Sequence, residues 1–243
     1  MGSLIVPDWP APANIRACCT TRRGGVSLPP YASLNLGDHV GDMPDSVAEN
    51  RQRLITLAGL PAAPQWLQQT HGTDVVTLDH TMSAPYRADG VYSQCAGQVC
   101  AVMTADCLPV LFCDRAGKEV AAAHAGWRGL CAGILENTLA CFNSTPGELY
   151  AWLGPAIGPQ AFEVGPEVKA AFVAHDPHAA RAFSPHGDTF FADIYQLARL
   201  RLLAAGVTQI YGAEHCTLTE SASFFSYRRD GVTGRMASLV WLI

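Results

Sequence analysis

Three short segments of this chain hold the residue types best suited to chemistry, a His or a Cys flanked by Gly, Pro or Asp. They are Gln68–Gly72, Thr104–Pro109 and His124–Gly129. The flanking residues favour turns, so each ligand group is expected to point into a space shared by several strand ends. Catalytic zinc is typically held by three protein ligands, with a fourth position open. The two imidazoles and one thiolate of His71, Cys107 and His124 therefore predict a zinc site.

Each of the three ligands also has a simpler interpretation when it is taken alone. A His in a turn, such as His71, is more often a surface or hydrogen-bonding residue. Cys107 stands between two apolar segments, where a cysteine usually serves as a small buried hydrophobe. His124 follows three alanines, and a buried imidazole without a polar partner costs roughly 1–3 kcal/mol. A metal supplies that partner, so the similar contexts of the three residues together favour the metal site.

Two neighbours of these ligands are candidates for catalysis or substrate binding. Arg128 lies in Gly-Trp-Arg-Gly at an expected helix start. Free backbone N–H groups there favour an anion and the guanidinium adds a bidentate fork, although a surface salt bridge is an equally good role for Arg128. Asp106 precedes Cys107 and could orient a ligand, transfer a proton or point away into a turn.

The elements that must position these residues alternate between strands and helices. Apolar runs predict strands over residues 15–21, 66–67, 75–78, 99–104, 109–113, 119–123, 149–153, 210–212 and 237–242. Helices are predicted over residues 45–58, with Asp45 as N-cap and Gly59 past the end, and over 130–142, 161–174 and 194–205. We find no repeat or linker in the sequence. We therefore expect an α/β (mixed α+β) fold, a single domain over residues 1–243 of packed mixed β-sheets flanked by helices.

The composition narrows the classes of partner. The 243 residues are 49% hydrophobic and 15% charged, with a net charge of −5 and no run of Lys or Arg, so nucleic acid is not expected to bind. The sequence shows neither a signal peptide nor a stretch long enough to span a membrane, which predicts a cytoplasmic protein without membrane contact. Its nine cysteines are irregularly spaced and are expected to be free in a reducing compartment.

Six motifs, read in order, make the chain similar to a known family. They are Gln-Thr-His-Gly (69–72), Arg-Ala-Asp-Gly-Val-Tyr-Ser (87–93), Thr-Ala-Asp-Cys-Leu-Pro-Val-Leu-Phe (104–112), His-Ala-Gly-Trp-Arg-Gly (124–129), Gly-Pro-Ala-Ile-Gly-Pro (154–159) and Phe-Phe-Ser-Tyr-Arg-Arg-Asp (224–230). From Leu4 to the C-terminus the chain resembles the bacterial YfiH family, also called the laccase-domain or "multicopper polyphenol oxidase" family.

This resemblance implies packed mixed sheets and a zinc ion held by His71, Cys107 and His124. It also implies phosphorolysis of adenosine, inosine and 5′-methylthioadenosine, with adenosine deamination as a companion activity. Purine nucleosides and phosphate are then the expected small-molecule partners, and Arg128 with the helix start could hold the phosphate. A role in editing peptidoglycan precursors has also been attached to bacterial members.

The oxidase name of the family fits these residues poorly. A multicopper oxidase needs about ten His plus a Cys, many of them in His-x-His pairs. This chain has eight His and no His-x-His. Copper can compete with zinc for a single His-Cys-His site, so copper-dependent polyphenol oxidation is expected as a side activity only.

Three hypotheses for the function stay open at this point. The first is a zinc-dependent purine nucleoside enzyme, in which zinc would also activate water for deamination. The second is a Cys-His hydrolase acting on a peptidoglycan-type amide, with Cys107 as nucleophile and His71 or His124 as base. The third is a metal-binding module without catalytic activity. The sequence leaves the oligomeric state open.

Overall fold

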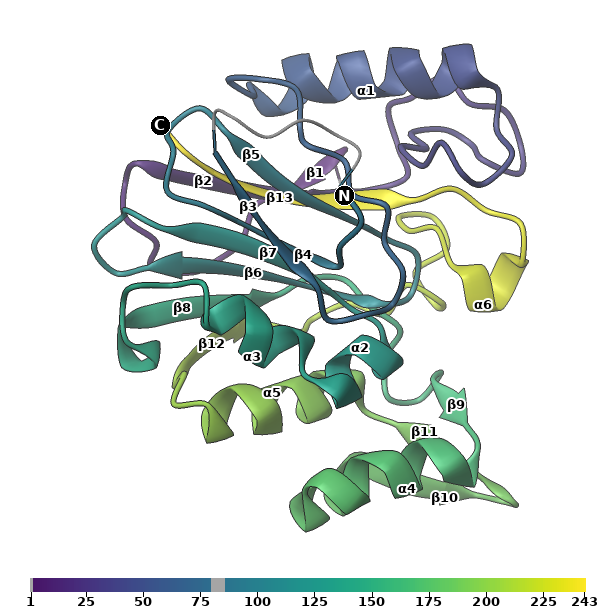
Figure 1. The fold of residues 1–243 in the computed structure, drawn as a ribbon. Helices are drawn as coiled ribbons and strands as arrows, with labels where there is room; N and C mark the ends of the chain where they lie inside the picture. The colour runs from purple at the N-terminus through teal and green to yellow at the C-terminus, as the bar shows by residue number, and fades with distance from the viewer. Residues whose placement is uncertain (1, 80–85) are drawn as a thin grey trace.

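The computed structural model describes residues 2–79 and 86–243, which form three β-sheets with helices outside them (Figure 1). In the first sheet all strands are antiparallel, and the C-terminal strand lies between two strands from earlier parts of the chain. The order is β1 (Leu4–Ile5), β2 (Ile15–Thr20), β13 (Met236–Leu242) and β5 (Val99–Thr104).

The second sheet is mixed, with parallel pairs at its two edges and antiparallel pairs between them. Its order is β12 (Gln209–Gly212), β8 (Leu149–Leu153), β6 (Leu108–Asp114), β7 (Val120–Ala125), β4 (Gly90–Ser93) and β3 (Val75–Leu78). The third sheet is small and antiparallel, and consists of β10 (Phe183–His186), β11 (Thr189–Ala192) and β9 (Glu163–Val164).

The two large sheets pack face to face, which explains the continuous apolar runs of the central strands. Val102 of β5, Leu111 of β6 and Val240 of β13 are fully buried in the cluster between the sheets. Because β5, β6 and β7 are also covered on their outer faces, every residue in them is buried. In Figure 1, α1 covers the outer face of the first sheet, and α3 and α5 lie against the outer face of the second.

The helices of the described residues are mostly short. They are α1 (Pro44–Ala58), α2 (Trp127–Ala132), α3 (Ile134–Leu139), α4 (Pro166–His175), α5 (Ile194–Ala204) and α6 (Tyr227–Asp230), with 3₁₀ turns at Pro146–Glu148 and Pro177–Ala182. Within these residues, no helix has the length and apolar character needed to cross a membrane. The described range includes all nine cysteines, and each of them is a free thiol.

The mixed α/β class and the strands at the centre of the two large sheets are confirmed, but two predicted helices are wrong in extent. The helix predicted over 130–142 begins earlier and is two helices, because Gly133 adopts φ 110° and ends α2 in a left-handed conformation. The helix predicted over 161–174 starts only at Pro166, where proline is favoured in the first turn, and β9 occupies part of the segment before it.

Smaller corrections concern caps and strands. The cap of α1 is Met43, and Asp45 lies inside the first turn, where its negative charge still favours the helix N-terminus. Residues 66–67 form no strand, because only isolated bridges pair Gln65 with Cys100 and Leu67 with Tyr86. Sequence patterns did not predict β4 or the third sheet, whose strands are short.

The ends of several strands meet at one edge of the second sheet. β7 ends at Ala125, and its antiparallel neighbours β4 and β6 begin beside that end. The chain before β4 therefore lies next to His124, whose backbone N–H donates to the Asp89 carbonyl at 2.7 Å. This edge brings together the turn after β5, the end of β7 and the loops that precede β3 and β4.

Candidate functional site

The ligand atoms of His71, Cys107 and His124 lie within 4.8 Å of one another. Cys107 Sγ is 3.8 Å from His71 Nε2, and the two imidazole rings stand edge to face with centroids 4.8 Å apart. His71 is exposed, Cys107 is half-buried and His124 is buried. The three side chains thus line one space that opens to solvent on the His71 side.

Local backbone geometry brings these three residues together. His71 and Asp106, the residue before Cys107, both adopt positive φ values, 61° and 91°, which L-residues seldom do. Gly126 follows the end of β7, and a Cβ there would lie 2.8 Å from the His71 ring and 3.2 Å from Cys107 Sγ. Only a glycine leaves room for the close approach, which accounts for the Gly in the His-Ala-Gly-Trp segment.

Asp89 is the residue that holds the two histidines in place. Its side chain is fully buried. One oxygen contacts His124 Nδ1 at 2.8 Å and accepts the His71 N–H at 2.9 Å. The other accepts from the Thr70 hydroxyl and from the N–H groups of Thr70 and Gly72. Because Nδ1 of His124 faces a carboxylate, its Nε2 is left to face the shared space.

Electrostatics favour the ionised forms of Asp89, Cys107 and His124. Burial opposes the charge on Asp89, but hydrogen bonds from His124 and from backbone N–H groups outweigh it and hold the pKa of Asp89 well below its usual range. Burial likewise opposes the thiolate, yet the two imidazoles lower the pKa of Cys107 to about 6. Against the same burial, Cys107 and Asp89 raise the pKa of His124 to about 9. Cys107 is therefore prepared to act as a thiolate.

Asp106 uses both carboxylate oxygens to fix the turn between β5 and β6. Oδ1 accepts from the Thr217 hydroxyl at 2.6 Å, and Oδ2 accepts from the Arg228 N–H at 2.7 Å. The side chain thus ties the turn that carries Cys107 to the C-terminal part of the chain. Because both oxygens are engaged, this geometry favours a role for Asp106 in orienting Cys107 over a role in proton transfer.

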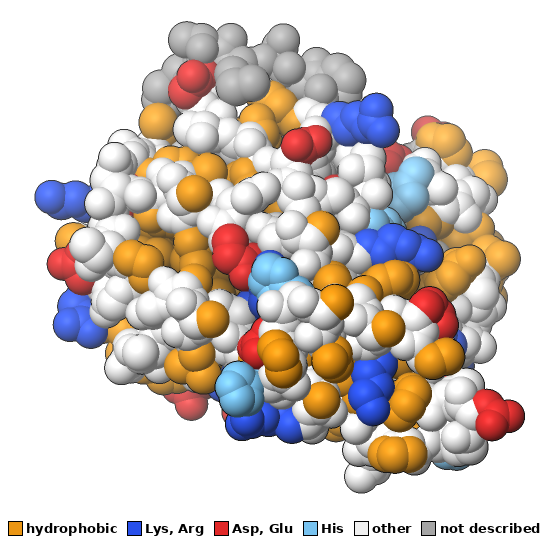
Figure 2. All heavy atoms as spheres, turned by 60° about the horizontal axis from the view of Figure 1, so that its bottom comes forward, with side chains coloured by type: hydrophobic (Ala, Val, Ile, Leu, Met, Phe, Trp, Pro, Cys, Tyr) orange, Lys and Arg blue, Asp and Glu red, His pale blue; other side chains and the backbone are white. Residues whose placement is uncertain are grey.

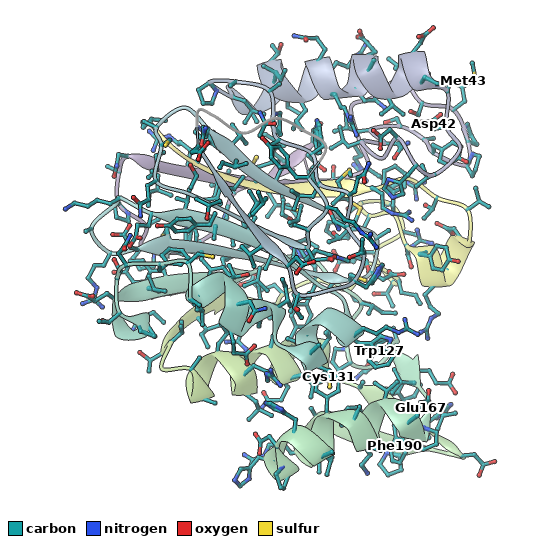
Figure 3. All side chains as sticks on the ribbon, in the orientation of Figure 1. Asp42, Met43, Trp127, Cys131, Glu167 and Phe190 are labelled. Carbon is teal, nitrogen blue, oxygen red and sulfur yellow. The ribbon has the colours of Figure 1, made fainter. Side chains whose placement is uncertain are left out.

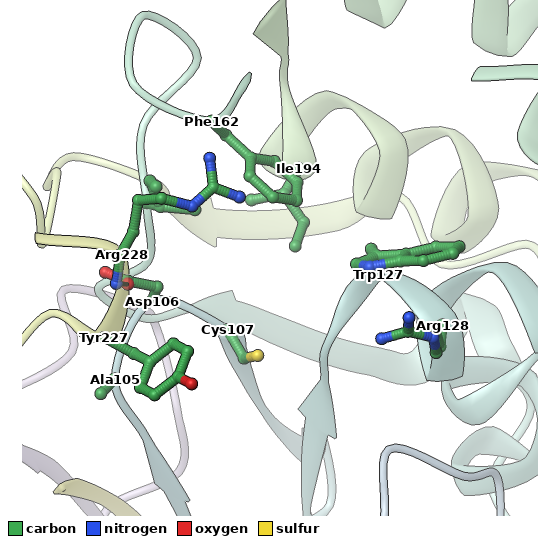
Figure 4. Close-up of a pocket in the computed structure, with 10 residues that line it drawn as sticks. Ala105, Asp106, Cys107, Trp127, Arg128, Phe162, Ile194, Tyr227 and Arg228 are labelled. Carbon is green, nitrogen blue, oxygen red and sulfur yellow. Dashed lines mark hydrogen bonds between the residues drawn. The ribbon is translucent and has the colours of Figure 1, made fainter. Parts of the chain in front are cut away.

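Two pockets adjoin the His-Cys-His group, and they share Ala105, Cys107 and Tyr227. We call the first, of about 280 Å³, the aromatic pocket; its other lining residues are Asp106, Trp127, Arg128, Ile157, Phe162, Ile194 and Arg228 (Figure 4). We call the second, of about 440 Å³, the polar pocket; its other lining residues are His39, Gln69, His71, Met103, Thr104, His124 and Arg235. Cys107 therefore lines both pockets, whereas His71 and His124 line the polar pocket alone.

Arg128 lines the aromatic pocket from the first turn of α2. Its guanidinium lies 4.6 Å from the centre of the Trp127 ring, and within the described residues it has no carboxylate within salt-bridge distance. α2 contacts α4, and Figure 3 shows Trp127 and Cys131 on the side of α2 that faces α4. On the face shown in Figure 2, basic side chains are scattered among acidic and hydrophobic ones.

Sequence reasoning missed several residues that the structure places at this site. Asp89, Tyr227, Arg228 and Arg235 were not identified as site residues, although three of them belong to motifs that define the resemblance. The one local signal was Asp89 directly before the short strand β4, since an aspartate there can orient a histidine from a neighbouring strand. Their importance depends on contacts between segments far apart in the chain.

Known proteins match the chain over its whole length. A family model described as "Multi-copper polyphenol oxidoreductase laccase" matches residues 16–243. The Escherichia coli protein named "Purine nucleoside phosphorylase YfiH" is 63% identical over 243 residues, covering 100% of both chains. A Haemophilus influenzae protein named "Purine nucleoside phosphorylase" is 53% identical over 240 residues, 98% of each.

Solved structures agree with these sequence relatives. The crystal structure of Neisseria meningitidis protein NMB0706 matches with a TM-score of 0.96 and 53% identity, covering 99% of each chain. YlmD from Geobacillus stearothermophilus matches with a TM-score of 0.88 and 35% identity, covering 95% of this chain and 92% of YlmD. The chain therefore belongs to the YfiH family, whose family model is described as multi-copper polyphenol oxidoreductase laccase.

Proposed function

We propose that this protein is a zinc-dependent purine nucleoside phosphorylase. The chain matches Escherichia coli and Haemophilus influenzae proteins that are named purine nucleoside phosphorylase, over 100% and 98% of their lengths. The observation that carries the proposal is the His71, Cys107 and His124 group in the polar pocket, with Cys107 also lining the adjoining aromatic pocket. Adenosine, inosine and 5′-methylthioadenosine are the proposed nucleosides, with adenosine deamination as a companion activity.

The three residues fit a zinc ion by their chemistry. One thiolate and two imidazoles are ligands that zinc prefers, and three of them leave one position open. His124 is oriented by Asp89, the arrangement that commonly supports a metal-binding imidazole. Bound there, zinc would supply a Lewis acid in the polar pocket, next to the aromatic pocket that Cys107 also lines.

The other residues of the site then bind and orient the substrates. Trp127, Phe162 and Tyr227 offer aromatic surfaces to a purine ring. Arg128 lines the same pocket with a guanidinium that has no carboxylate partner among the described residues, and we assign it to substrate binding. Asp106 is a positioning residue, because both of its oxygens are engaged in holding the turn before Cys107.

A multicopper centre does not fit this chain. The described residues contain one group of His, Cys, Asp and Glu side chains close enough to share a metal, and it has three members. The chain has eight His in total, fewer than the roughly ten that a multicopper oxidase uses. We therefore propose no oxidase function, and regard phenol oxidation by a single bound copper as a side reaction.

A Cys-His hydrolase is the second candidate, and one distance favours it. Cys107 Sγ lies 3.8 Å from His71 Nε2, which is a little longer than the contact between a thiol nucleophile and its base but close enough to tighten on substrate binding. Such an enzyme would act on an amide without metal or phosphate.

Replacing Cys107 separates the two candidates. As a phosphorylase, the wild-type protein should contain about one zinc per chain and release ribose 1-phosphate from inosine only with phosphate. Cys107→Ala should then lose both zinc and phosphorolysis, as measured by metal analysis and product assay. A parent that works without zinc or phosphate, and a Cys107→Ala variant that is inactive while any bound metal stays in place, would favour the hydrolase.

A further inference from the structure

Arg235 stands out in the polar pocket as a half-buried cation without a carboxylate partner. Its Nη1 donates to the carbonyls of Thr233 and Gly234 at 3.1 and 3.0 Å, and among the described residues no carboxylate lies within 4.0 Å of its guanidinium. The nearby acidic groups are Cys107, which is proposed as a zinc ligand, and Asp106, whose two oxygens are both engaged elsewhere. A guanidinium stays protonated, so the remaining N–H groups favour an anion in the pocket.

Thr104 adds an independent sign of a missing ligand. It lies at the end of β5, its side chain is 2% exposed, and it lines the polar pocket. Its hydroxyl has no hydrogen-bond partner in the described part of the molecule. A buried hydroxyl without a partner is unfavourable, so an oxygen of a bound ligand would satisfy it. The neighbouring Gln69 does not compete for that ligand, because both ends of its amide are bonded to the Met103 backbone.

The aromatic pocket has a different character. Trp127 and Tyr227 stand on opposite sides of the Cys107 sulfur in Figure 4, with Phe162 and Ile194 closing the space between them. Flat aromatic and aliphatic walls suit a planar heterocycle. The Arg128 guanidinium at the rim can donate to N7 of any of the proposed purines and, in the 6-oxopurine of inosine, to O6 as well.

The arrangement of the two pockets matches the geometry of phosphorolysis. A phosphate oxygen forms a bond to C1′ of the ribose while the bond from C1′ to purine N9 breaks, so phosphate and purine lie on opposite faces of C1′. The bonding electron pair leaves with the purine, and the proton of hydrogen phosphate ends on the purine. The shared residues Ala105, Cys107 and Tyr227 mark where the ribose would lie between the pockets.

We propose that the polar pocket is the phosphate subsite, with the Arg235 guanidinium and the Thr104 hydroxyl as phosphate ligands, and that the aromatic pocket is the purine subsite. The assignment of roles rests on the proposed phosphorylase function. It places phosphate away from Arg128 and the start of α2, where the sequence had suggested it. Arg128 then contacts the purine edge.

Separate Michaelis constants for phosphate and inosine test the assignment on zinc-loaded protein. Arg235→Gln should raise the KM for phosphate at least tenfold. The same variant should change the KM for inosine less than about threefold. Arg235→Lys keeps the charge and should recover part of the loss. Thr104→Val keeps the shape and should raise the phosphate KM several-fold. Trp127→Ala should do the reverse, raising the inosine KM about tenfold. Arg53→Gln, on the exposed face of α1, is the matched control.

Calorimetric titration with inorganic phosphate tests the subsite without turnover. Wild-type protein should bind phosphate, and Arg235→Gln should bind it at least tenfold more weakly. The proposal is overturned if wild type binds no phosphate, if both proteins bind it equally, or if Arg128→Gln is the variant that loses it. A wild type that binds phosphate through Arg235 but cleaves no nucleoside would instead refute the phosphorylase function and leave the anion subsite in place.

Discussion

At the scale of single residues, the site depends on a side chain that would touch neither the metal nor the substrate. The Asp89 carboxylate accepts four N–H or O–H donors from residues 70–72 and also contacts His124 Nδ1. It thereby holds the left-handed backbone of His71 and selects the His124 nitrogen that is free for a metal. Two of the three ligands are thus fixed by one buried acid.

Replacing this acid by its amide should weaken metal binding. Asp89→Asn keeps the size of the side chain, but its NH₂ group cannot accept the N–H groups of Thr70 and Gly72. We expect the zinc affinity to fall about 10- to 100-fold, the usual effect of losing a partner that orients a metal-binding imidazole. Competition against a chromophoric chelator measures the zinc affinity of wild type and variant. Asp188→Asn, at the exposed turn between β10 and β11, should have no effect, and an equal affinity in Asp89→Asn would contradict the role.

At the scale of elements, a second buried acid joins strands to a loop at the other end of the second sheet. Glu119, just before β7, accepts from the Tyr92 hydroxyl of β4 and from the N–H groups of Asn143 and Ser144 after α3. Burial opposes its ionisation, but the hydrogen bonds from Ser144, Tyr92 and Asn143 outweigh it and lower the pKa of Glu119 to about 2. This acid therefore stabilises the folded state in its ionised form.

The sign of the pH dependence follows from this shift. A depressed folded-state pKa gives stability that is complete above the unfolded pKa of 4.5 and is lost as the pH falls towards 2. Glu119→Gln should lower the free energy of unfolding by about 2–3 kcal/mol at pH 7. The difference from wild type should shrink between pH 5 and 2, as measured by urea titration. Glu49→Gln, exposed on α1, is the control, and a difference independent of pH would argue against this account.

At the scale of the whole molecule, the candidate site connects segments from very different parts of the chain. His71 lies in the loop before β3, Cys107 follows β5 at the interface of the two large sheets, and His124 ends β7 of the second sheet. Asp106 adds the C-terminal segment through Thr217 and Arg228. A metal bound by these ligands would therefore hold several segments together.

Metal binding should consequently raise the melting temperature of the whole molecule. Zinc at a free concentration about 1,000 times its dissociation constant adds about 4 kcal/mol to the unfolding free energy. For a chain of 243 residues this corresponds to a shift of roughly 8–16 °C, since each kcal/mol moves the midpoint by about 2–4 °C. Calorimetry of chelator-treated and zinc-loaded protein gives the shift. Cys107→Ala should show little of it, and an undiminished shift in that variant would place the metal elsewhere.

Local sequence context is enough to single out the residues of the His-Cys-His group. His71, Cys107 and His124 are each flanked by turn-forming residues after or before apolar runs, so their convergence could be predicted from local signals. The buried strands β5, β6 and β7 were equally visible, because burial on both faces requires continuous apolar sequence.

The polar residues that surround this group could be identified only from contacts between segments distant in the chain. Asp89, Thr104 and Arg235 look ordinary in sequence, and their roles come from partners or missing partners that are distant along the chain. The break at Gly133 was hidden because glycine inside an apolar helical pattern can either continue the helix or end it. Local propensity cannot carry that information, since the deciding free energy is that of contacts between segments.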